Sequence, residues 1–253
     1  MIEGEPQKYS PSSVEVNGVR VFGEKAGRVE PREIDEIASR TDLLLHLTRH
    51  LASLSPEAKQ RLCELRVRVG QEMRPVDDAY LAKQTETAGS KFHPAVDDPY
   101  KLIDFCVEKL RQMVSDESEI PWVRLETGEW RATLQIPITP EDKAEFGIPS
   151  GESFGTASVV EITPELQARV EKEARGKGEA VDGITVNVIR GMPEPPSDNL
   201  IVVIRKRNEG EPAQLYTAYT GVPAPALPRP DKQSPEELSY NSEWWEKHAF
   251  IKP

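Results

Sequence analysis

The sequence predicts an α+β fold in which N-terminal helices precede a mainly antiparallel β-sheet, followed by a proline-rich arm and a short C-terminal helix. Three observations favour this class. Apolar residues recur at helical spacing over residues 31–73 and again over residues 98–114. The pattern then changes to the strand period, beginning with Trp130–Ile138. The later strand candidates are joined by segments too short for the helical crossovers of a parallel sheet, which favours antiparallel neighbours.

The first 30 residues are polar and rich in turn-forming residues, and they predict little regular structure. Residues 14–22 are the exception, because Asn17-Gly18 is a strong signal for a two-residue hairpin turn between alternating segments. We expect a short, isolated hairpin there. Pro31 then opens a stripe of apolar residues that continues to Leu54 and predicts the first helix.

A second helix is predicted from Pro56 to about Met73, because Ser55 can cap it and proline suits its first position. Its inward residues would be Leu62, Leu65 and Val69. Residues 74–90 lose the periodicity and predict a connector, so we place a domain boundary there. The expected parts are a polar segment (1–30), a helical region with a linker (31–89) and an α+β domain (90–253) that includes the arm (222–233).

The predicted α+β domain begins with a helix that Asp98-Pro99 initiates and that ends near Val114. Trp130–Ile138 alternates between apolar and polar residues, which predicts a strand with one buried face. The continuous apolar run Leu200–Ile204 predicts a strand that is central in its sheet. The other expected elements are strands over 156–162, 183–189, 199–207 and 214–220, a hairpin loop over 208–212 and a charged helix over 164–175.

The C-terminal part is unusual in its proline content. Prolines recur through residues 222–230, which predicts an extended arm that cannot join a central ladder. Ser234-Pro235-Glu236-Glu237 is a capping signature for a short helix. Trp244, Trp245 and Phe250 are expected to pack this tail back onto the sheet; the alternative is an aromatic pair that stacks nucleobases.

Charge and composition exclude several classes of protein. With 32 basic and 43 acidic residues, the chain has the wrong sign for a protein that coats nucleic acid non-specifically. No apolar run reaches the roughly 20 residues of a membrane helix, so we expect no membrane contact. The acidic N-terminus lacks a secretory signal, which predicts a cytoplasmic protein. Cys63 and Cys106 have no metal-binding or disulfide spacing, and we expect no cofactor and no bound metal.

The four histidines are the candidates for proton transfer, because the signatures of P-loop nucleotidases, Rossmann dehydrogenases, serine hydrolases and zincins are missing from the sequence. His46 and His50 have a spacing that suits one metal ion, but no third ligand accompanies them, and a solvated helix flank is the preferred interpretation. His93 lies in a rigid loop before Pro94, from which its side chain can project toward a substrate. His248 lies in the aromatic tail, where packing and function are both open.

The strongest local signal comes from two successive strands near the C-terminus. The cations are Arg205, Lys206 and Arg207 at the end of the first, and the hydroxyl groups belong to Tyr216, Thr217, Tyr219 and Thr220 of the second. An antiparallel ladder would set the cations beside the hydroxyl groups. Arginine can clamp a phosphate with two parallel hydrogen bonds and stabilise the charge of a pentacoordinate transition state. The alternative is an exposed hairpin with solvated charges.

This order of elements resembles the barnase–EndoU–colicin–RelE group of metal-independent ribonucleases found in bacterial toxins. The resemblance covers about residues 90–221 and rests on Thr217-Ala218-Tyr219, on the strand that ends in Arg-Lys-Arg and on the loop histidine. It implies that RNA is the partner and that the ribose 2′-hydroxyl attacks the adjacent phosphate to give a cyclic phosphate. It further implies that His93 transfers protons, that Arg205 or Lys206 clamps the phosphate, and that Thr217 and Tyr219 position the substrate.

Two other functions stay open at this level. One is a non-enzymatic binding or structural protein that docks a protein partner, or a second copy of itself, through the proline-rich arm and Trp244-Trp245. The other is a regulatory or toxin-neutralising protein whose acidic surface suits a basic partner. A ribonuclease requires His93, Arg205 and Thr217 to converge on one site, whereas a binding protein requires exposed apolar surface around the two tryptophans.

Overall fold

A six-stranded antiparallel sheet forms the centre of the molecule in the computed structural model, which describes residues 12–35, 37, 41–85, 90–115, 120–157, 163–176 and 195–248. Its strand order is β1-β2-β6-β7-β10-β11. The strands are β1 (Ser13–Val16), β2 (Val19–Arg28), β6 (Pro121–Leu125), β7 (Trp130–Pro137), β10 (Asn199–Lys206) and β11 (Gln214–Thr220). Every pairing between them is antiparallel, which confirms the predicted fold class.

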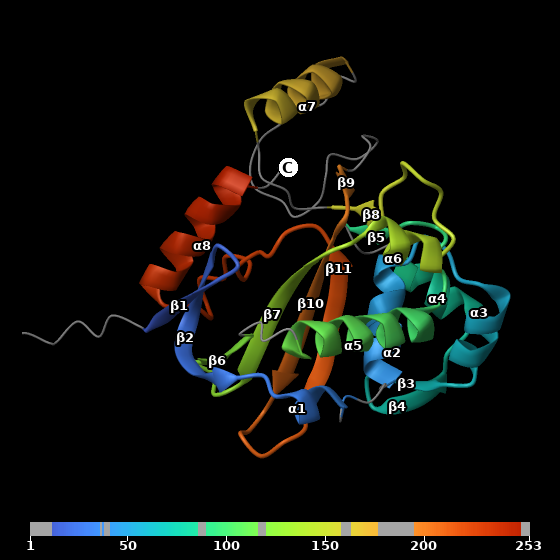
Figure 1. Ribbon diagram of the computed structural model, residues 1–253, viewed down its shortest axis with the longest axis horizontal. Helices are drawn as coiled ribbons and strands as arrows, with labels where there is room; N and C mark the ends of the chain where they lie inside the picture. Colours follow the sequence, from blue (N-terminus) through green and yellow to red (C-terminus); the bar gives the residue numbers. More distant parts are fainter. Residues whose placement is uncertain are drawn as a thin grey trace, which may run out of the picture.

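Helices and two small sheets surround this sheet (Figure 1). The helices are α1 (Pro31–Asp35), α2 (Thr41–Leu47), the 3₁₀ turn η1 (Thr48–His50), α3 (Pro56–Cys63), α4 (Asp78–Thr85), α5 (Pro99–Ser115), α6 (Pro140–Glu145), α7 (Pro164–Gly176) and α8 (Pro235–His248). The small sheets are β3 (Arg66–Val69) with β4 (Glu72–Pro75), and β5 (Lys91–Phe92) with β8 (Gly155–Thr156) and β9 (Pro196–Ser197). No helix in these described ranges is long and apolar enough to cross a membrane.

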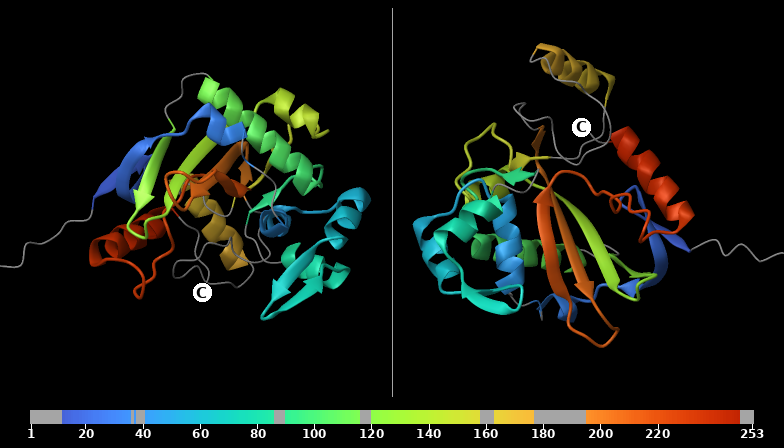
Figure 2. Two further views of the ribbon diagram at one scale, coloured as in Figure 1. Left: turned by 90° about the horizontal axis from the view of Figure 1, so that it is seen from below. Right: turned by 180° about the vertical axis from the view of Figure 1, so that it is seen from behind.

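The long helix α5 covers one face of the sheet, and the other face is turned toward the viewer when the molecule is seen from behind (Figures 1 and 2). Its sequence explains this position, because Leu102, Ile103, Cys106 and Leu110 form one buried stripe. Asp98 caps the helix by accepting a hydrogen bond from the Tyr100 N–H at 2.8 Å. The predicted helix over 98–114 is therefore confirmed.

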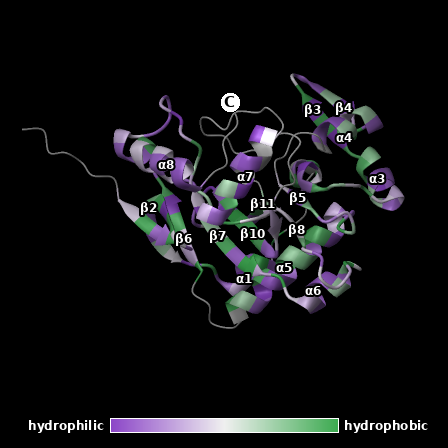
Figure 3. Cartoon of the chain, turned by 90° about the horizontal axis from the view of Figure 1, so that it is seen from above, coloured by the Kyte–Doolittle hydropathy of each residue, from purple (hydrophilic) through white to green (hydrophobic). Residues whose placement is uncertain are grey.

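Strand β10 is central, as its apolar run predicts, because it pairs with β7 on one side and β11 on the other. Leu200, Ile201, Val202 and Ile204 are all fully buried at 0% exposure. Figure 3 shows the hydrophobic residues gathered in β7 and β10, whereas α7 is largely hydrophilic. The predicted strands over 130–138, 199–207 and 214–220 are confirmed to within a residue, and so is the charged helix over 164–175. The predicted strand over 183–189 and most of that over 156–162 lie outside the described residues.

Residues 66–75 do not continue the helix that was predicted from Pro56 to Met73. The helix α3 ends at Cys63, and β3 and β4 form a hairpin that turns at Gly70, whose φ of 64° favours glycine. Arg66-Val67-Arg68-Val69 alternates at the strand period, so the spacing that suggested a helix also fits a strand. Val69 was expected to face inward and is instead 43% exposed.

The N-terminal hairpin is part of the main sheet rather than isolated. Asn17 and Gly18 form the predicted turn between β1 and β2, and β2 continues far enough to pair with β6. Hydrophobic residues from both sides of the expected boundary at 74–90 belong to one cluster, which includes Leu47 and Leu62 before it and Leu102 and Val202 after it. The described part of the predicted helical region thus shares its core with the sheet.

The proline-rich arm runs from β11 at one edge of the sheet to α8, which lies beside β1 and β2 (Figure 1). Tyr240 of α8 accepts a hydrogen bond from the Arg20 N–H at 2.8 Å and meets the Phe22 ring edge-to-face at 5.9 Å. Trp245 is 3% exposed, packs against Val222 and Ala224 of the arm, and donates its Nε1–H to the Ala226 carbonyl at 3.1 Å. The tail therefore packs on its own arm; Phe250 lies outside the described residues.

Candidate functional site

The two faces of β10 and β11 have different chemistry. Side chains of a strand alternate, so Leu200, Val202 and Ile204 belong to the core beneath α5, and Arg205 lies on the opposite face. The register pairs Val203 with Thr217 and Ile201 with Tyr219, which places Thr217 and Tyr219 on the face of Arg205. The structure therefore brings three of the predicted site residues to one face of the sheet.

A histidine from α2 joins this face. Helix α2 lies against β11 because Leu43, Leu44, Leu45 and Leu47 are buried in the core, and His46 is the half-buried residue among them. The Nε2 atom of His46 lies 3.0 Å from the Thr217 hydroxyl oxygen. The ring of His46 also stacks on that of Tyr216, with centroids 6.2 Å apart and planes 20° apart. The solvated flank preferred for His46 is thus replaced by contacts with β11.

Two arginines lie side by side next to these residues. Arg131 of β7 is the direct cross-strand neighbour of Arg205, an arrangement of like charges that is unfavourable without an anion. Glu129 provides part of the compensation, because its carboxylate lies 3.2 Å from Arg131 and 3.7 Å from Arg205. The Nε–H of Arg131 is buried and has no hydrogen-bond partner. An anion such as phosphate would complete the charge balance.

His50 lies one turn after His46 and is held in place by Ser90. Its Nδ1 atom is 3.0 Å from the Ser90 hydroxyl oxygen and 3.3 Å from the Ser90 carbonyl oxygen, so the ring is anchored in either tautomer. Burial lowers the pKa of His50 to about 4, and the neighbouring positive charges of His46, Lys91 and Arg49 act in the same direction. His50 is therefore neutral at neutral pH.

Tyr219 closes the site on the side of His50. The two rings have centroids 6.2 Å apart. Burial raises the pKa of Tyr219 to about 12, although the nearby charge of Arg131 opposes the shift. The phenol therefore keeps its proton at neutral pH and can donate a hydrogen bond.

We call this group the His46–Thr217 cluster. Its members are His46, His50, Arg131, Arg205, Tyr216, Thr217 and Tyr219. It combines imidazoles for proton transfer, guanidinium groups for a negative charge and hydroxyl groups for positioning. Among the residues that the structure describes, no group of three His, Cys, Asp or Glu side chains is arranged to hold a metal ion.

Lys206 does not join the cluster, and its predicted role as a phosphate clamp is corrected here. It alternates to the opposite face of β10, where it is 5% exposed and donates to the Glu33 carboxylate at 2.6 Å. The rings of Trp122 and Trp130 flank its ammonium group, each centroid 4.7 Å away. Its charge is already paired and covered by aromatic rings, so it is a structural cation.

The hydrogen bonds of His93 go to residues other than Arg205 and Thr217. Its Nε2 atom pairs with the Glu152 carboxylate at 2.8 Å, and its Nδ1 atom accepts the Ala95 N–H at 3.1 Å. The main-chain N–H of His93 donates to the Phe154 carbonyl. The Nε2 contact joins the loop after β5 to the segment before β8, and the Nδ1 contact lies within that loop, so both ring nitrogens have structural partners.

The remaining histidine and the cysteines also have packing contacts. His248 stacks on Trp244 with centroids 4.5 Å apart, and its Nδ1 atom is 2.9 Å from the Trp244 carbonyl oxygen. Cys106 is fully buried, and burial raises the pKa of its thiol to about 12. Cys63 is half-buried next to Asp78. These residues form no part of the cluster.

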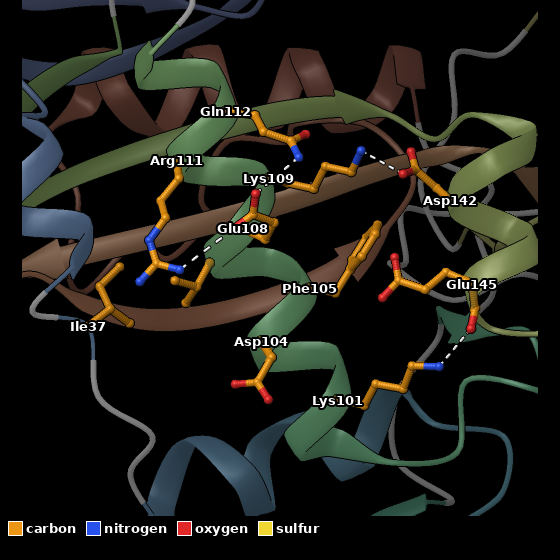
Figure 4. Close-up of a pocket in the computed structure, with 11 residues that line it drawn as sticks. Ile37, Lys101, Asp104, Phe105, Glu108, Lys109, Arg111, Gln112, Asp142 and Glu145 are labelled. Carbon is orange, nitrogen blue, oxygen red and sulfur yellow. Dashed lines mark hydrogen bonds and ion pairs between the residues drawn. The ribbon is translucent and has the colours of Figure 1, made fainter.

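A separate pocket of about 510 Å³ lies between α5 and α6, on the α5 side of the sheet (Figure 4). Its charged side chains are mostly paired with one another. Figure 4 shows Lys109 directed at Asp142, 2.6 Å away, and Lys101 directed at the Glu145 carbonyl, 2.7 Å away. Because those cations are already engaged, we regard the pocket as a salt-bridged surface groove and the His46–Thr217 cluster as the candidate site.

Sequence reasoning identified Arg205, Thr217 and Tyr219 but missed His46, His50 and Arg131 as partners. Two signals were present in the sequence. The histidine pair has helical spacing, and Arg131 lies on the polar face of the alternating segment. Comparison with protein-family models, with curated proteins and with solved structures found no match to this chain, so the site is interpreted from its geometry alone.

Proposed function

We propose that this protein is a metal-independent endoribonuclease that cleaves RNA at the His46–Thr217 cluster. The observation that carries the proposal is the 3.0 Å contact between His46 Nε2 and Thr217 Oγ1 beside the paired guanidinium groups of Arg131 and Arg205. Transesterification of RNA needs proton transfer and stabilisation of a dianionic phosphorane. Histidine and arginine side chains supply both without a metal ion.

In the proposed reaction the ribose 2′-oxygen forms a bond to the adjacent phosphorus, and the bond from phosphorus to the 5′-oxygen breaks. The ring of His46 accepts the 2′-hydroxyl proton, and the hydroxyl of Thr217 orients that ring. Arg131 and Arg205 stabilise the charge on the non-bridging oxygens. Tyr219, whose raised pKa of about 12 keeps it protonated, donates its proton to the leaving 5′-oxygen, and the proton held by His46 restores the phenol through solvent after the product leaves.

The test is cleavage of RNA by the purified protein in EDTA, followed by analysis of the product ends. We expect 2′,3′-cyclic phosphates, and a loss of about 100-fold or more in His46→Ala and in Arg205→Ala. Arg124→Ala is the matched control, because Arg124 is an exposed arginine of β6 outside the cluster. His93→Ala tests the histidine that the resemblance favours. Loss of activity in His93→Ala, with full activity in His46→Ala, would contradict the assignment to His46.

The alternative of a protein that docks partners through its C-terminal tail has less support. It requires apolar surface around the two tryptophans, but Trp245 is buried against the chain's own arm. Trp244 is half-buried between Trp245 and His248, whose ring centroids lie 5.1 Å and 4.5 Å away. Intact RNA after incubation at high protein concentration would favour this alternative over the ribonuclease.

A further inference from the structure

Tyr216 occupies an irregular position in β11. The pairing with β10 shifts between Val203, which faces Thr217, and Ile204, which faces Leu215. Tyr216 is therefore the extra residue of a β-bulge and has no cross-strand partner. A bulge reorients the side chain of its extra residue. Here it directs Tyr216 to the same face as its neighbour Thr217, where regular alternation would have separated the two.

The contacts of the Tyr216 ring show which face it joins. The guanidinium carbon of Arg205 lies 4.3 Å from the ring centroid, and that of Arg131 lies 6.0 Å from it. His46 stacks on the ring from α2. The ring thus adjoins the two arginines and the histidine that the proposed reaction uses.

Tyr216 is nevertheless 39% exposed, whereas Leu215 and Ala218 of the same strand are buried. The other large hydrophobic side chains with comparable exposure among the described residues lie in other elements: Val69 and Met73 in the β3–β4 hairpin and Leu227 in the arm. An accessible aromatic ring beside paired cations is the arrangement with which proteins hold single-stranded nucleic acid, since the cations contact the backbone and a base stacks on the ring.

The ring already has contacts before any ligand arrives. Arg205 and His46 contact part of its surface, so a base would stack on the part of the ring that stays exposed. We propose that Tyr216 is the stacking platform for a nucleobase next to the scissile phosphate. Stacking accepts every base, and the larger overlap of purines makes a purine the preferred occupant. This inference rests on the proposed ribonuclease function and adds a residue that recognises the substrate.

The experiment compares three short oligonucleotides, each with a single ribonucleotide that defines the scissile phosphate. One has a purine on both sides of that phosphate, and the other two have an abasic residue on the 5′ or the 3′ side. The proteins are the wild type, Tyr216→Phe and Tyr216→Ala. Phenylalanine keeps the aromatic face and removes the hydroxyl group, so it is the matched control for stacking.

We expect one of the two abasic substitutions to lower kcat/KM of the wild type by about 10-fold or more. Tyr216→Ala should lose a similar factor on the substrate with both purines, and it should lose nothing further on that abasic substrate. Tyr216→Phe keeps the discrimination of the wild type. If Tyr216 acted only by positioning Arg205, Tyr216→Ala would lower cleavage of all three substrates equally, which would overturn the inference. A wild-type protein that cleaves none of them contradicts the ribonuclease proposal itself.

Discussion

His46 Nε2 and Thr217 Oγ1 lie 3.0 Å apart although the two residues are 171 positions apart in the chain. The contact joins a helix near the N-terminus to the last strand of the sheet. It is the point at which the candidate site is assembled, because β11 also brings Tyr216 and Tyr219 and its neighbour β10 brings Arg205.

The His46–Thr217 contact can be measured by a double-mutant cycle. We expect Thr217→Val to lower kcat by about 10-fold, since the hydroxyl that orients the imidazole is lost, and Thr217→Ser to retain most of the activity. His46→Ala and the double variant should be about equally inactive, because residues that act as a unit are not additive. Additive losses would show that the two side chains work independently. Urea unfolding of each variant separates lost activity from lost folding.

The buried ion pair between Lys206 and Glu33 predicts a large effect on stability. Lys206→Met leaves the Glu33 carboxylate without its partner, and we expect the free energy of unfolding to fall by about 3 kcal/mol. Lys206→Met combined with Glu33→Gln should recover part of this loss, because no unpaired charge then remains. The measurement is urea denaturation at neutral pH. Equal stability of the single and double variants would contradict the prediction.

The lowered pKa of Glu33 also predicts that the stability of the protein depends on pH under acidic conditions. Burial alone would raise its pKa, but hydrogen bonds from Lys206, the Glu30 N–H and Trp122 lower the pKa below its usual 4.5. A carboxylate with a lowered folded pKa stabilises the protein above that usual value, and the stabilisation is lost as the pH falls through the folded pKa. We therefore expect a stability loss below about pH 4.5 that is smaller in Glu33→Gln, measured by unfolding at pH 5 and at pH 3.5.

His50 affects the stability of the protein at a higher pH than Glu33 does. Its pKa falls from 6.5 to about 4 in the folded protein, so the unfolded chain binds more protons between these values and stability decreases as the pH falls from 6.5 toward 4. The slope contributed by one such group is at most about 1.4 kcal/mol per pH unit. His50→Gln removes the titrating ring, and we expect a flatter profile of unfolding free energy between pH 7 and pH 5. An unchanged slope would show that the folded pKa of His50 is not lowered.

Trp245 should hold the proline-rich arm on the molecule. Replacing it by alanine removes a 3% exposed indole and its hydrogen bond to the Ala226 carbonyl, and the expected loss is about 3 kcal/mol of local or global stability. Limited proteolysis and hydrogen exchange of residues 222–234 report the release of the arm. Trp244→Ala is the matched comparison, because Trp244 is only half-buried and should have a smaller effect.

The sequence alone determined the elements whose residues interact locally. Asp98-Pro99 and the apolar stripe after it predict α5, the alternation of Trp130–Ile138 predicts β7, and the unbroken Leu200–Ile204 predicts a central strand. Capping bonds and side-chain periodicity involve residues that are close together in the chain, so the sequence alone is enough to predict them.

Tertiary structure decided the site. Alternation along β10 sends Arg205 and its neighbour Lys206 to opposite faces, and which face receives the core depends on where α5 packs. The bulge at Tyr216 depends on the register with β10, and the partner of Thr217 depends on the position of α2. The sequence shows that His46 and His50 are four residues apart, but the contact of His46 with Thr217 arises from packing between segments that are remote in sequence. Residues 66–75 show a related limit, because an apolar spacing that fits both a helix and a strand is resolved only by the pairing of β3 with β4.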